Sequence, residues 1–358
     1  MQPFVYEGLP SRVVFGQGTL SRLEEELERL GCRRVLVLST PQQRDQAEQV
    51  LAQVGERGAG LFAEAAMHTP VEVTERALRR VEELGVDATV AIGGGSTIGL
   101  GKAIALRTDL PQVAIPSTYA GSEMTPILGE TRDGIKTTQR TLAVLPETVI
   151  YDVDLTLTLP AGLSGTSGIN AIAHAVEALY ARDRNPVISL MAEEGIAALA
   201  RSLPVIADTP TDAAARADAL YGAWLCGACL GSVGMSLHHK LCHTLGGSFD
   251  LPHAETHTVV LPHATAYNAP AAPEAMSRIA RALGVKDAAA GLFDLAGAVG
   301  APTSLGALGF TAEDIDRATE IATRNPYWNP REVETDGIRR LLADAQAGRR
   351  PASEEAPS

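Results

Sequence analysis

The sequence has little of several residue types, and each shortage narrows the kinds of protein it can encode. Aromatic residues make up 4% of the chain, and four cysteines are spread over 358 residues. So few cysteines, with Cys32 far from the other three, do not suggest a disulfide framework and favour reduced thiols. Basic residues are also scarce: 30 Lys and Arg face 43 Asp and Glu, for a net charge of -13. Because such a surface repels phosphate groups, we expect neither nucleic acid nor an anionic membrane as a partner.

Long uninterrupted apolar runs are missing as well. No stretch is long and apolar enough to predict a membrane span, and "MQPFVYEGLPSRVVFG" lacks the basic and apolar regions of a signal peptide. The hydrophobic content of 45% is that of a chain with a packed core. We therefore expect a folded cytoplasmic protein.

The first half of the chain alternates strand and helix patterns. The apolar runs "RRVLVLST", "AGLFAEA", "DATVAIGGG" and "PQVAIPST" predict strands, and residues 42–54 predict a helix between the first two. "TPVEVTERALRRVEELG" predicts another helix, with Thr69 as N-cap and Pro70 at its first position. Such alternation predicts a Rossmann-like α/β domain with a parallel sheet.

The second half reads as helices from Ala161 onward, in segments rich in alanine and leucine such as "GINAIAHAVEALYA" and "PVISLMAEEGIAALARSL". "LPAGLSG" is a plausible hinge between the halves. We predict an α/β dinucleotide-binding domain over residues 1–158 and an all-α domain over residues 159–348. A disordered tail is predicted over residues 349–358, and an active site in the cleft between the domains.

Three loops at strand ends predict a dinucleotide site. Glycines let the backbone approach a ligand, a helix start offers free N–H groups to a phosphate, and small hydroxyl side chains can donate to phosphate or ribose. Taken alone, the glycine run fits an empty strand–helix turn equally well. The strand predicted by "RRVLVLST" ends in Ser39 and Thr40 without a carboxylate, so we expect NADPH to be accepted as well as NADH, with Arg44 as a further phosphate partner. The predicted cofactor residues are Gly93, Gly94, Gly95 and Ser96 in the first loop, Ser117, Thr118, Gly121, Ser122 and Thr125 in the second, and Ser39 and Thr40 in the third.

Six of the eight histidines lie between Met235 and His263. His239 and His243 are four residues apart, which places them on one face of a helix, and Asn170 and His174 have the same spacing. With His253, from a loop, these side chains can converge in the core of a helical bundle. His238, His257 and His263 are interpreted as structural or rim residues. Cys226 and Cys229, in "CGAC", are interpreted as packing residues because no second pair accompanies them.

The ordered motifs "GGGS", "PSTYAGSEMTP", "LPETVIYDVDLTLTLP", "GINAIAHAVEA", "HKLCHTLGG" and "LPHAETHTVVLPH" resemble the iron-containing alcohol dehydrogenase family. The resemblance extends from about Arg12 to Gly348. Within the family, "GIKTTQRTLAVLPETVIYD" and "NPYWNPR" are most similar to the enzymes that reduce maleylacetate to 3-oxoadipate during aromatic-compound degradation. The resemblance implies the same fold as in glycerol dehydrogenase and dehydroquinate synthase.

The resemblance also implies a metal site, which this sequence alters. Typical members bind a divalent ion through an aspartate and three histidines, and the matching positions are Asn170, His174, His239 and His253. A neutral amide supplies no charge and is a poorer ligand than a carboxylate. We therefore expect no obligatory metal; an ion that did bind would use these four residues. Gly99 likewise stands where the family often has an aspartate, and its missing charge suits an acidic substrate.

Reduction of a conjugated carbon–carbon double bond can proceed without a metal ion. The developing negative charge spreads into an enolate, which a hydrogen-bond donor can stabilise. The predicted catalytic residue is His243, supported by His174, His239 and His253. A dicarboxylate substrate needs cationic or hydroxyl partners, and we expect Lys136, Tyr327 and Arg331, together with Asn170, to supply them. A homodimer is expected. The alternatives are a metal-dependent alcohol or polyol dehydrogenase and a catalytically silent nucleotide-binding protein.

Overall fold

The computed structural model describes residues 4–325 and 327–351, and contacts divide them into two units. One unit is Gly8–Leu159 and the other runs from Pro160, so the division falls one residue from the predicted boundary. Residues 4–7 group with the second unit rather than with the first, where the sequence placed them. Most of the predicted tail, residues 352–358, lies outside the described residues. Arg349 and Arg350, at its start, form ion pairs with Asp344 and Asp294.

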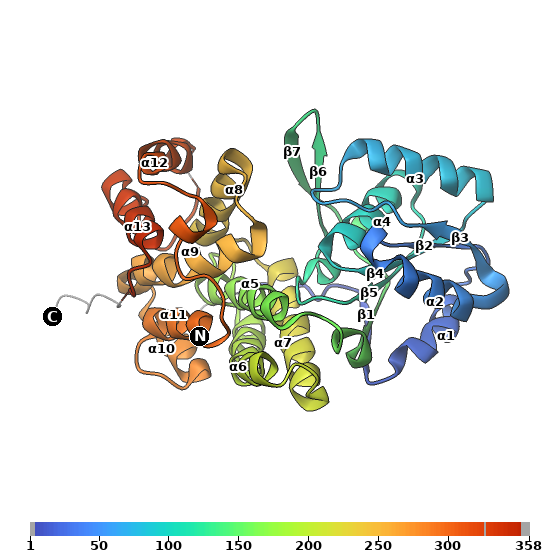
Figure 1. Cartoon of the computed structure of the whole chain (residues 1–358), viewed down its shortest axis with the longest axis horizontal. Coiled ribbons are helices and arrows are strands. Elements are labelled where there is room, and N and C mark those ends of the chain that lie inside the picture. Colours follow the sequence, from blue (N-terminus) through green and yellow to red (C-terminus); the bar gives the residue numbers. More distant parts are fainter. Residues whose placement is uncertain (1–3, 326, 352–358) are drawn as a thin grey trace. The chain divides into compact units, whose positions relative to one another are not determined.

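The first unit is built on a parallel sheet of six strands in the order β1-β8-β5-β4-β2-β3. Figure 1 labels the strands β1 to β5 of this sheet. The predicted α/β domain with a parallel sheet is confirmed. The sequence analysis did not predict the outer strand β1, its neighbour β8, or the separate antiparallel hairpin of β6 and β7. The strands are β1 (Arg12–Gly16), β2 (Val35–Leu38), β3 (Gly58–Phe62), β4 (Ala88–Gly93), β5 (Gln112–Pro116), β6 (Ile127–Arg132), β7 (Ile135–Arg140) and β8 (Thr148–Asp152).

The side chains of each strand point alternately to the two faces of this sheet, and helices cover both faces. Val35 and Val37 of β2 pack in one apolar cluster with the helices α1 and α2, whereas Leu36 and Leu38 pack in another with α3 and α4. Successive side chains of a strand point to opposite faces, so a fully apolar strand serves two cores. The helices are α1 (Leu23–Arg29), α2 (Arg44–Val54), α3 (Val71–Leu84) and α4 (Gly95–Thr108).

The predicted start of α3 is wrong by one residue. The N-cap is Pro70, in extended conformation, and not Thr69. Thr69 has a left-handed φ of 47° and is buried, so its side chain does not cap the helix.

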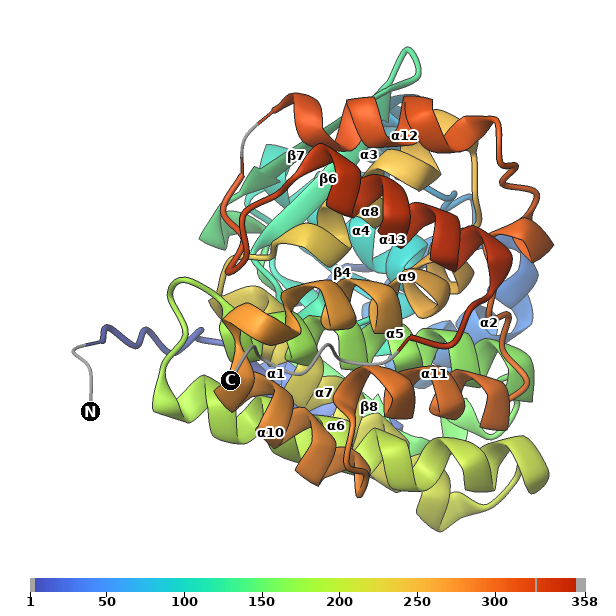
Figure 2. The ribbon, with the colours of Figure 1, turned by 90° about the vertical axis from the view of Figure 1, so that its left-hand side faces the viewer.

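The second unit contains helices and no strand among its described residues, in agreement with the sequence prediction, and Figure 2 shows its helices. Two of them, α7 and α8, are bent by 94° at the break between Ser232 and Leu237. The helices are α5 (Ala161–Tyr180), α6 (Pro186–Asp208), α7 (Ala213–Ser232), α8 (Leu237–Phe249), α9 (His253–Asn268), α10 (Pro273–Leu283), α11 (Ala288–Ala298), α12 (Asp314–Arg324) and α13 (Thr335–Ala347).

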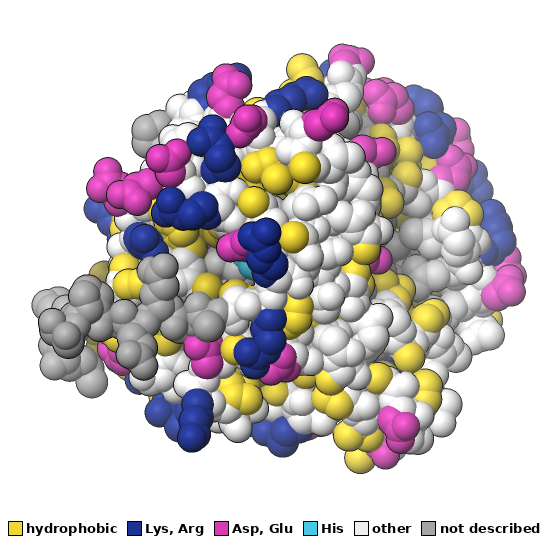
Figure 3. Space-filling model, turned by 60° about the vertical axis from the view of Figure 1, so that its left-hand side comes forward, with side chains coloured by type: hydrophobic (Ala, Val, Ile, Leu, Met, Phe, Trp, Pro, Cys, Tyr) yellow, Lys and Arg dark blue, Asp and Glu magenta, His cyan; other side chains and the backbone are white. Residues whose placement is uncertain are grey.

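An apolar core fixes α8 and α9 against the C-terminal helices. Leu241 and Leu245 of α8 pack with Val260 of α9, Ala322 of α12 and Leu342 of α13. In the described part of the chain, no individual helix has the length and apolarity of a membrane span, although the bent pair α7 and α8 together meets those two criteria. On the face drawn in Figure 3, Lys and Arg are interspersed with Asp and Glu rather than forming one basic surface.

Candidate active site

The strand order places the predicted cofactor loops at one edge of the sheet. The chain moves outward from β2 to β3 and then crosses to β4 on the other side of β2, so the order reverses between β2 and β4. In open parallel sheets, ligands bind at the carboxyl ends of strands beside such a reversal. Thr40 follows β2, Gly93 ends β4, and Ser117 follows β5. The structure therefore brings the three predicted loops together.

One side chain that the sequence analysis did not single out joins these loops. Gln43 donates from Nε2 to Ser117 Oγ at 2.8 Å, and its Oε1 accepts from Thr40 Oγ1 at 3.3 Å. Gly93 has a φ of 147°, and a Cβ there would lie 2.5 Å from Gln43 Oε1. The glycine is thus required both by backbone conformation and by the closeness of Gln43.

The glycine loop leads directly into a helix. Gly94 is the N-cap of α4, Gly95 is its first residue, and Ser96 follows with partial exposure. The first N–H groups of a helix have no partner within it, and the helix dipole favours an anion there. Thr118 lies over this start, because a Cβ on Gly94 would be 3.2 Å from its hydroxyl. These features suit the pyrophosphate of a dinucleotide.

The second loop is held from beneath by Lys102 of α4, which is fully buried. Its Nζ donates to the carbonyl oxygens of Ser122, Thr125 and Ile127 at 2.5 to 2.9 Å, and to Thr125 Oγ1 at 2.9 Å. The Thr125 hydroxyl is therefore engaged inside the loop, where it also bonds to Ser122 O. Burial lowers the pKa of Lys102 to about 7, against the opposing effect of the Glu123 charge. A lysine within the apolar stretch "IGLGKAIAL" was the sequence signal for this contact.

The structure shows the backbone contacts of Ser39 and the backbone conformation of Gly121. Ser39 is fully buried and joins the backbone of β3 through its N–H, which donates to Phe62 O at 3.1 Å. Gly121 adopts a left-handed φ of 79° before a short helical turn that begins at Ser122. Neither observation tests the prediction that they contact a cofactor.

Gly99 lies one helical turn after Gly95, and the space for a side chain there is filled. A Cβ on Gly99 would collide with Thr69 Oγ1. His68 and Thr69 both have left-handed φ values, of 64° and 47°, which bring the Thr69 hydroxyl against α4. Where the family often has an aspartate, this chain therefore has a neutral hydroxyl from a neighbouring loop.

The histidines of the second unit other than His263 form one cluster between α5, α8 and α9. The ring centroids of His174 and His239 are 5.0 Å apart, those of His239 and His243 are 6.4 Å apart, and those of His253 and His257 are 4.2 Å apart. His239 and His257 are separated by 5.1 Å and join the two groups. The sequence prediction that His174, His239, His243 and His253 converge thus agrees with this geometry. His253 is the first residue of α9 rather than part of a loop.

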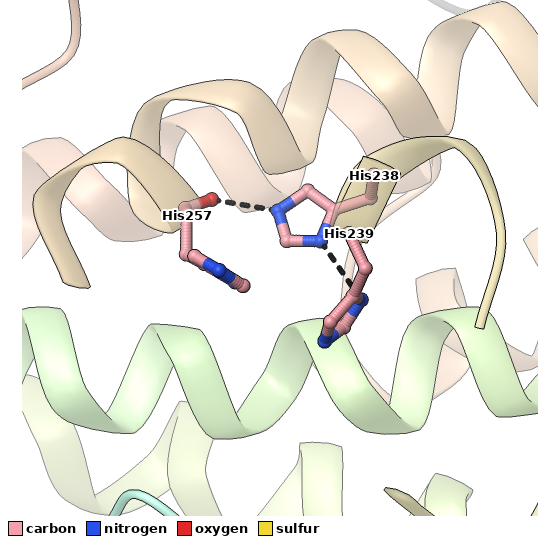
Figure 4. A group of neighbouring side chains, drawn as sticks. All are labelled: His238, His239 and His257. Carbon is pink, nitrogen blue, oxygen red and sulfur yellow. Dashed lines mark hydrogen bonds between the residues drawn. The ribbon is translucent and has the colours of Figure 1, made fainter. Parts of the chain in front are cut away.

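Two further histidines, interpreted from the sequence as structural or rim residues, lie in this cluster. His238 and His257 are both buried, and their ring centroids are 4.9 Å apart. Figure 4 shows both rings beside His239. Helical periodicity gave no sign that α9 would place His257 toward α8. His263 does lie apart, beside Phe293.

The cluster has a buried part and an exposed part. His174, His238, His239 and His257 are buried, whereas His243 and His253 are exposed. Burial lowers the pKa of His238 to about 4 and the pKa values of His239 and His257 well below 6.5, because an imidazolium loses its hydration there. The rings of His238, His239 and His257 are therefore neutral, and each carries one N–H donor and one lone pair.

The hydrogen bonds show which nitrogen carries the proton in two of these rings. His239 Nδ1 lies 2.7 Å from Glu177 Oε2 and His238 Nε2 lies 2.9 Å from the carbonyl oxygen of His257. A carbonyl and a carboxylate accept, so both rings donate at these positions. The other nitrogen of His239, Nε2, lies 3.0 Å from His174 Nδ1. Neither ring nitrogen of His257 has a hydrogen-bond partner among the described residues.

The residues that would form the family's metal site do not fit a divalent ion well. Asn170 is buried on α5, and its Oδ1 has no partner among the described residues, but this oxygen is neutral. Among the His, Cys, Asp and Glu residues in the described part of the chain, one group brings ligand atoms within 4.8 Å of one another, and it consists of His238, His239 and His257. That group shares only His239 with the set implied by the resemblance. We therefore derive no step through a metal.

The predicted substrate residues have different surroundings. Tyr327 has a buried hydroxyl with no partner among the described residues, and burial, together with the charge of Glu177, raises its pKa, so that it remains a donor. Arg331 donates to Tyr267 O at 3.0 Å and lies over the Tyr267 ring. Lys136 is exposed on β7 of the first unit. Arg331 thus contacts Tyr267 rather than the histidine cluster, and Lys136 belongs to the other unit.

Comparisons with known proteins agree with these observations. Residues 10–153 match the family described as iron-containing alcohol dehydrogenase, and residues 164–346 match the C-terminal part of the same family. A maleylacetate reductase of Rhizobium sp. (strain MTP-10005) is 59% identical, over 98% of this chain and all of that protein. The crystal structure of maleylacetate reductase from Agrobacterium tumefaciens is similar with a TM-score of 0.96 and 59% identity, over 98% of this chain and all of that one.

A more distant structure shares the fold alone. Sulfoacetaldehyde reductase from Bifidobacterium kashiwanohense, determined in complex with NAD+, has a TM-score of 0.88 at 21% identity, over 96% of this chain and 99% of that one. Together with the closer relatives, these matches extend over both units. The chain belongs to the iron-containing alcohol dehydrogenase family of NAD(P)H-dependent oxidoreductases.

Proposed function

We propose that this chain catalyses the reduction of the conjugated carbon–carbon double bond of maleylacetate to 3-oxoadipate by NADH or NADPH. The observation that carries the proposal is the similarity to proteins named maleylacetate reductase, which are 51 to 59% identical over 97 to 98% of this chain. The proposed setting is the cytoplasmic breakdown of aromatic compounds.

The chemistry divides into a hydride transfer and a proton transfer. A bound NADH or NADPH would supply the hydride. Addition of that hydride to the alkene carbon beside the carboxylate would move the electron pair of the double bond toward the ketone and form an enolate. A proton then adds to the carbon beside the ketone. No strong charge localises on one oxygen, so hydrogen-bond donors can stabilise the transition state.

His243 is the proposed donor. It is exposed, unlike His239 one helical turn before it, so a substrate can reach its ring without displacing buried side chains. His253 is exposed as well, while His174 and His239 lie behind them in the buried part of the cluster.

The dicarboxylate is proposed to contact Tyr327, Asn170, Lys136 and Arg331. Tyr327 has the better support, since its buried hydroxyl has no partner among the described residues. An unpaired buried donor is costly, and a substrate carboxylate would relieve that cost by accepting from this hydroxyl. Asn170 would contact a carboxylate through its NH2 group, because its Oδ1 can only accept. We also propose that the protein is a homodimer and that no metal is obligatory, because Asn170 supplies no charge to a divalent ion.

The test is a reduction with NADH carrying deuterium at the transferred position. We expect NADH absorbance to fall with maleylacetate, and NMR spectra of the product to show deuterium on the methylene beside the carboxylate and two carbons from the ketone. Deuterium on a carbinol carbon would instead show ketone reduction, as expected of a metal-dependent alcohol dehydrogenase. No oxidation of either NADH or NADPH would identify a catalytically silent protein.

A further inference from the structure

Glu177 is a buried carboxylate beside the histidine cluster for which the predicted chemistry gives no role. It lies on α5, three residues after His174, and its side chain is fully buried. A buried carboxylate is retained only when donors compensate for its lost hydration. Glu177 has four such donors.

Three of the donors come from the start of α8. Ser236, the N-cap of that helix, donates its backbone N–H to Oε2 at 2.9 Å and its hydroxyl to Oε1 at 3.0 Å. The backbone N–H of His238 donates to Oε1 at 2.8 Å. Glu177 therefore caps α8 from another helix, which is a structural role that requires no catalysis.

The fourth donor reaches the cluster itself. Because Oε2 accepts the Nδ1–H of His239 at 2.7 Å, the lone pair of this neutral ring is on Nε2. That lone pair lies 3.0 Å from His174 Nδ1, which must then be the donor of the pair. One carboxylate thus determines the direction of two successive hydrogen bonds.

We propose that Glu177 is a positioning residue that fixes the tautomer of His239, and through it that of His174, for the reduction proposed above. The role rests on that proposed function, but it is defined by hydrogen bonds that exist without substrate. Fixed rings present the same donors and acceptors to each substrate molecule, which lowers the reorganisation needed in the transition state.

Glu177→Gln separates this role from capping. An amide has one acceptor oxygen and one NH2 group, whereas all four contacts of Glu177 require an acceptor. With the NH2 group in place of Oε2, the backbone N–H of Ser236 cannot adapt, but the His239 ring can move its proton to Nε2 and accept at Nδ1. The new Nε2–H would then face His174 Nδ1–H.

The control is Ser236→Ala, which removes one hydroxyl donor from Glu177 and leaves the contact with His239 in place. Protein labelled with 15N in histidine reports the tautomer of each ring in long-range 1H–15N NMR spectra, without any requirement for turnover. The other readouts are the melting temperature, kcat with maleylacetate and the KM for NADH.

We expect the wild-type spectra to show His239 protonated at Nδ1, and Glu177→Gln to move this proton to Nε2. In Glu177→Gln, we expect kcat to fall about 100-fold, which is the upper end of the effects seen when a residue that hydrogen-bonds to a site histidine is replaced. The KM for NADH should stay within threefold. Ser236→Ala lowers the melting temperature but keeps the wild-type tautomers, with kcat within threefold. If maleylacetate proves not to be the substrate, the NMR result still tests the tautomer proposal by itself.

Three results would overturn the proposal. The first is a wild-type His239 protonated at Nε2, a measurement that needs no variant and stands even if Glu177→Gln does not fold. The second is a Glu177→Gln protein with unchanged tautomers. The third is a Ser236→Ala protein whose kcat falls as far as that of Glu177→Gln. Any of these outcomes would reduce Glu177 to a cap of α8.

Discussion

Each of the two units buries one charged side chain beneath the segment predicted to contact a ligand. In the α/β unit, Lys102 donates to four oxygens of residues 122–127. In the helical unit, Glu177 accepts four hydrogen bonds from Ser236, His238 and His239. The cation organises backbone carbonyls and so shapes a loop, whereas the anion organises N–H groups and so orients imidazoles. We therefore expect that removal of the Lys102 side-chain donor mainly weakens cofactor binding. Removal of the Glu177 carboxylate should mainly lower kcat.

The largest effect, on kcat, is expected from a substitution in the exposed part of the histidine cluster. His243→Ala removes the proposed proton donor, and loss of a general acid lowers rates about 100- to 10,000-fold. We expect kcat to fall in that range while the dissociation constant for NADH, measured by fluorescence titration, is unchanged. Unaltered kcat would show that His243 is not the proton donor. Weaker NADH binding would contradict the expectation that the α/β unit determines cofactor affinity and the helical unit determines turnover.

A large effect on affinity is expected from Lys102→Met, which keeps the length of the side chain but no donor. Buried oxygens of residues 122–127 lose their partner, so the free energy of unfolding should fall by about 3 kcal/mol and NADH should bind at least tenfold more weakly. Lys286→Met, at an exposed lysine of the helical unit, is the control and should leave both quantities unchanged. A Lys102→Met protein with normal NADH affinity and lowered kcat would reverse the proposed comparison.

A moderate effect is expected where Thr69 meets α4. Gly99→Ala adds a Cβ that collides with Thr69 Oγ1, and overpacking of this kind costs about 1 to 3 kcal/mol. The loss should appear in chemical denaturation, and NADH affinity should fall a few-fold. Adding Thr69→Ala removes the colliding oxygen and should recover at least half of the stability. Equal stability of the single and double variants would show that Thr69 does not occupy this space.

The smallest effect concerns the choice between cofactors. β2 is followed by Ser39 and Thr40 without a carboxylate, and Arg44 begins α2. We expect the kcat/KM values for NADH and NADPH to differ by less than about tenfold, and Arg44→Ala to raise the KM for NADPH about threefold without changing that for NADH. No measurable oxidation of NADPH at millimolar concentration would contradict this prediction.

Much of the fold could be predicted because local patterns decide it. The apolar runs before Ser39 and Gly93, and the alanine-rich helices after Ala161, are read from periodicity alone. β1 is a different case, since its residues Arg12–Gly16 become a strand by pairing with β8, more than 130 residues later. Pairing at such distance leaves no local signal.

The candidate site was predictable only in part for the same reason. Spacing of four residues identified His239 and His243 as neighbours, and motif order identified His174 and His253. The positions of His257 and Glu177 depend on how α5, α8 and α9 pack, which spacing within one helix does not determine. The sequence did contain a signal for Lys102 and Glu177, because each is a charged residue within an apolar stretch. A charge in such a stretch indicates a buried hydrogen-bonding site.

The central claim is that imidazoles and their hydrogen-bond partners carry this reduction without an obligatory metal. It is tested most directly by measuring kcat with maleylacetate for protein treated with a strong chelator, after elemental analysis has shown less than a tenth of an equivalent of iron or zinc. We predict that kcat stays within twofold of the untreated protein and that added iron or zinc does not raise it. Loss of turnover on chelation, with recovery on addition of either metal, would contradict the claim.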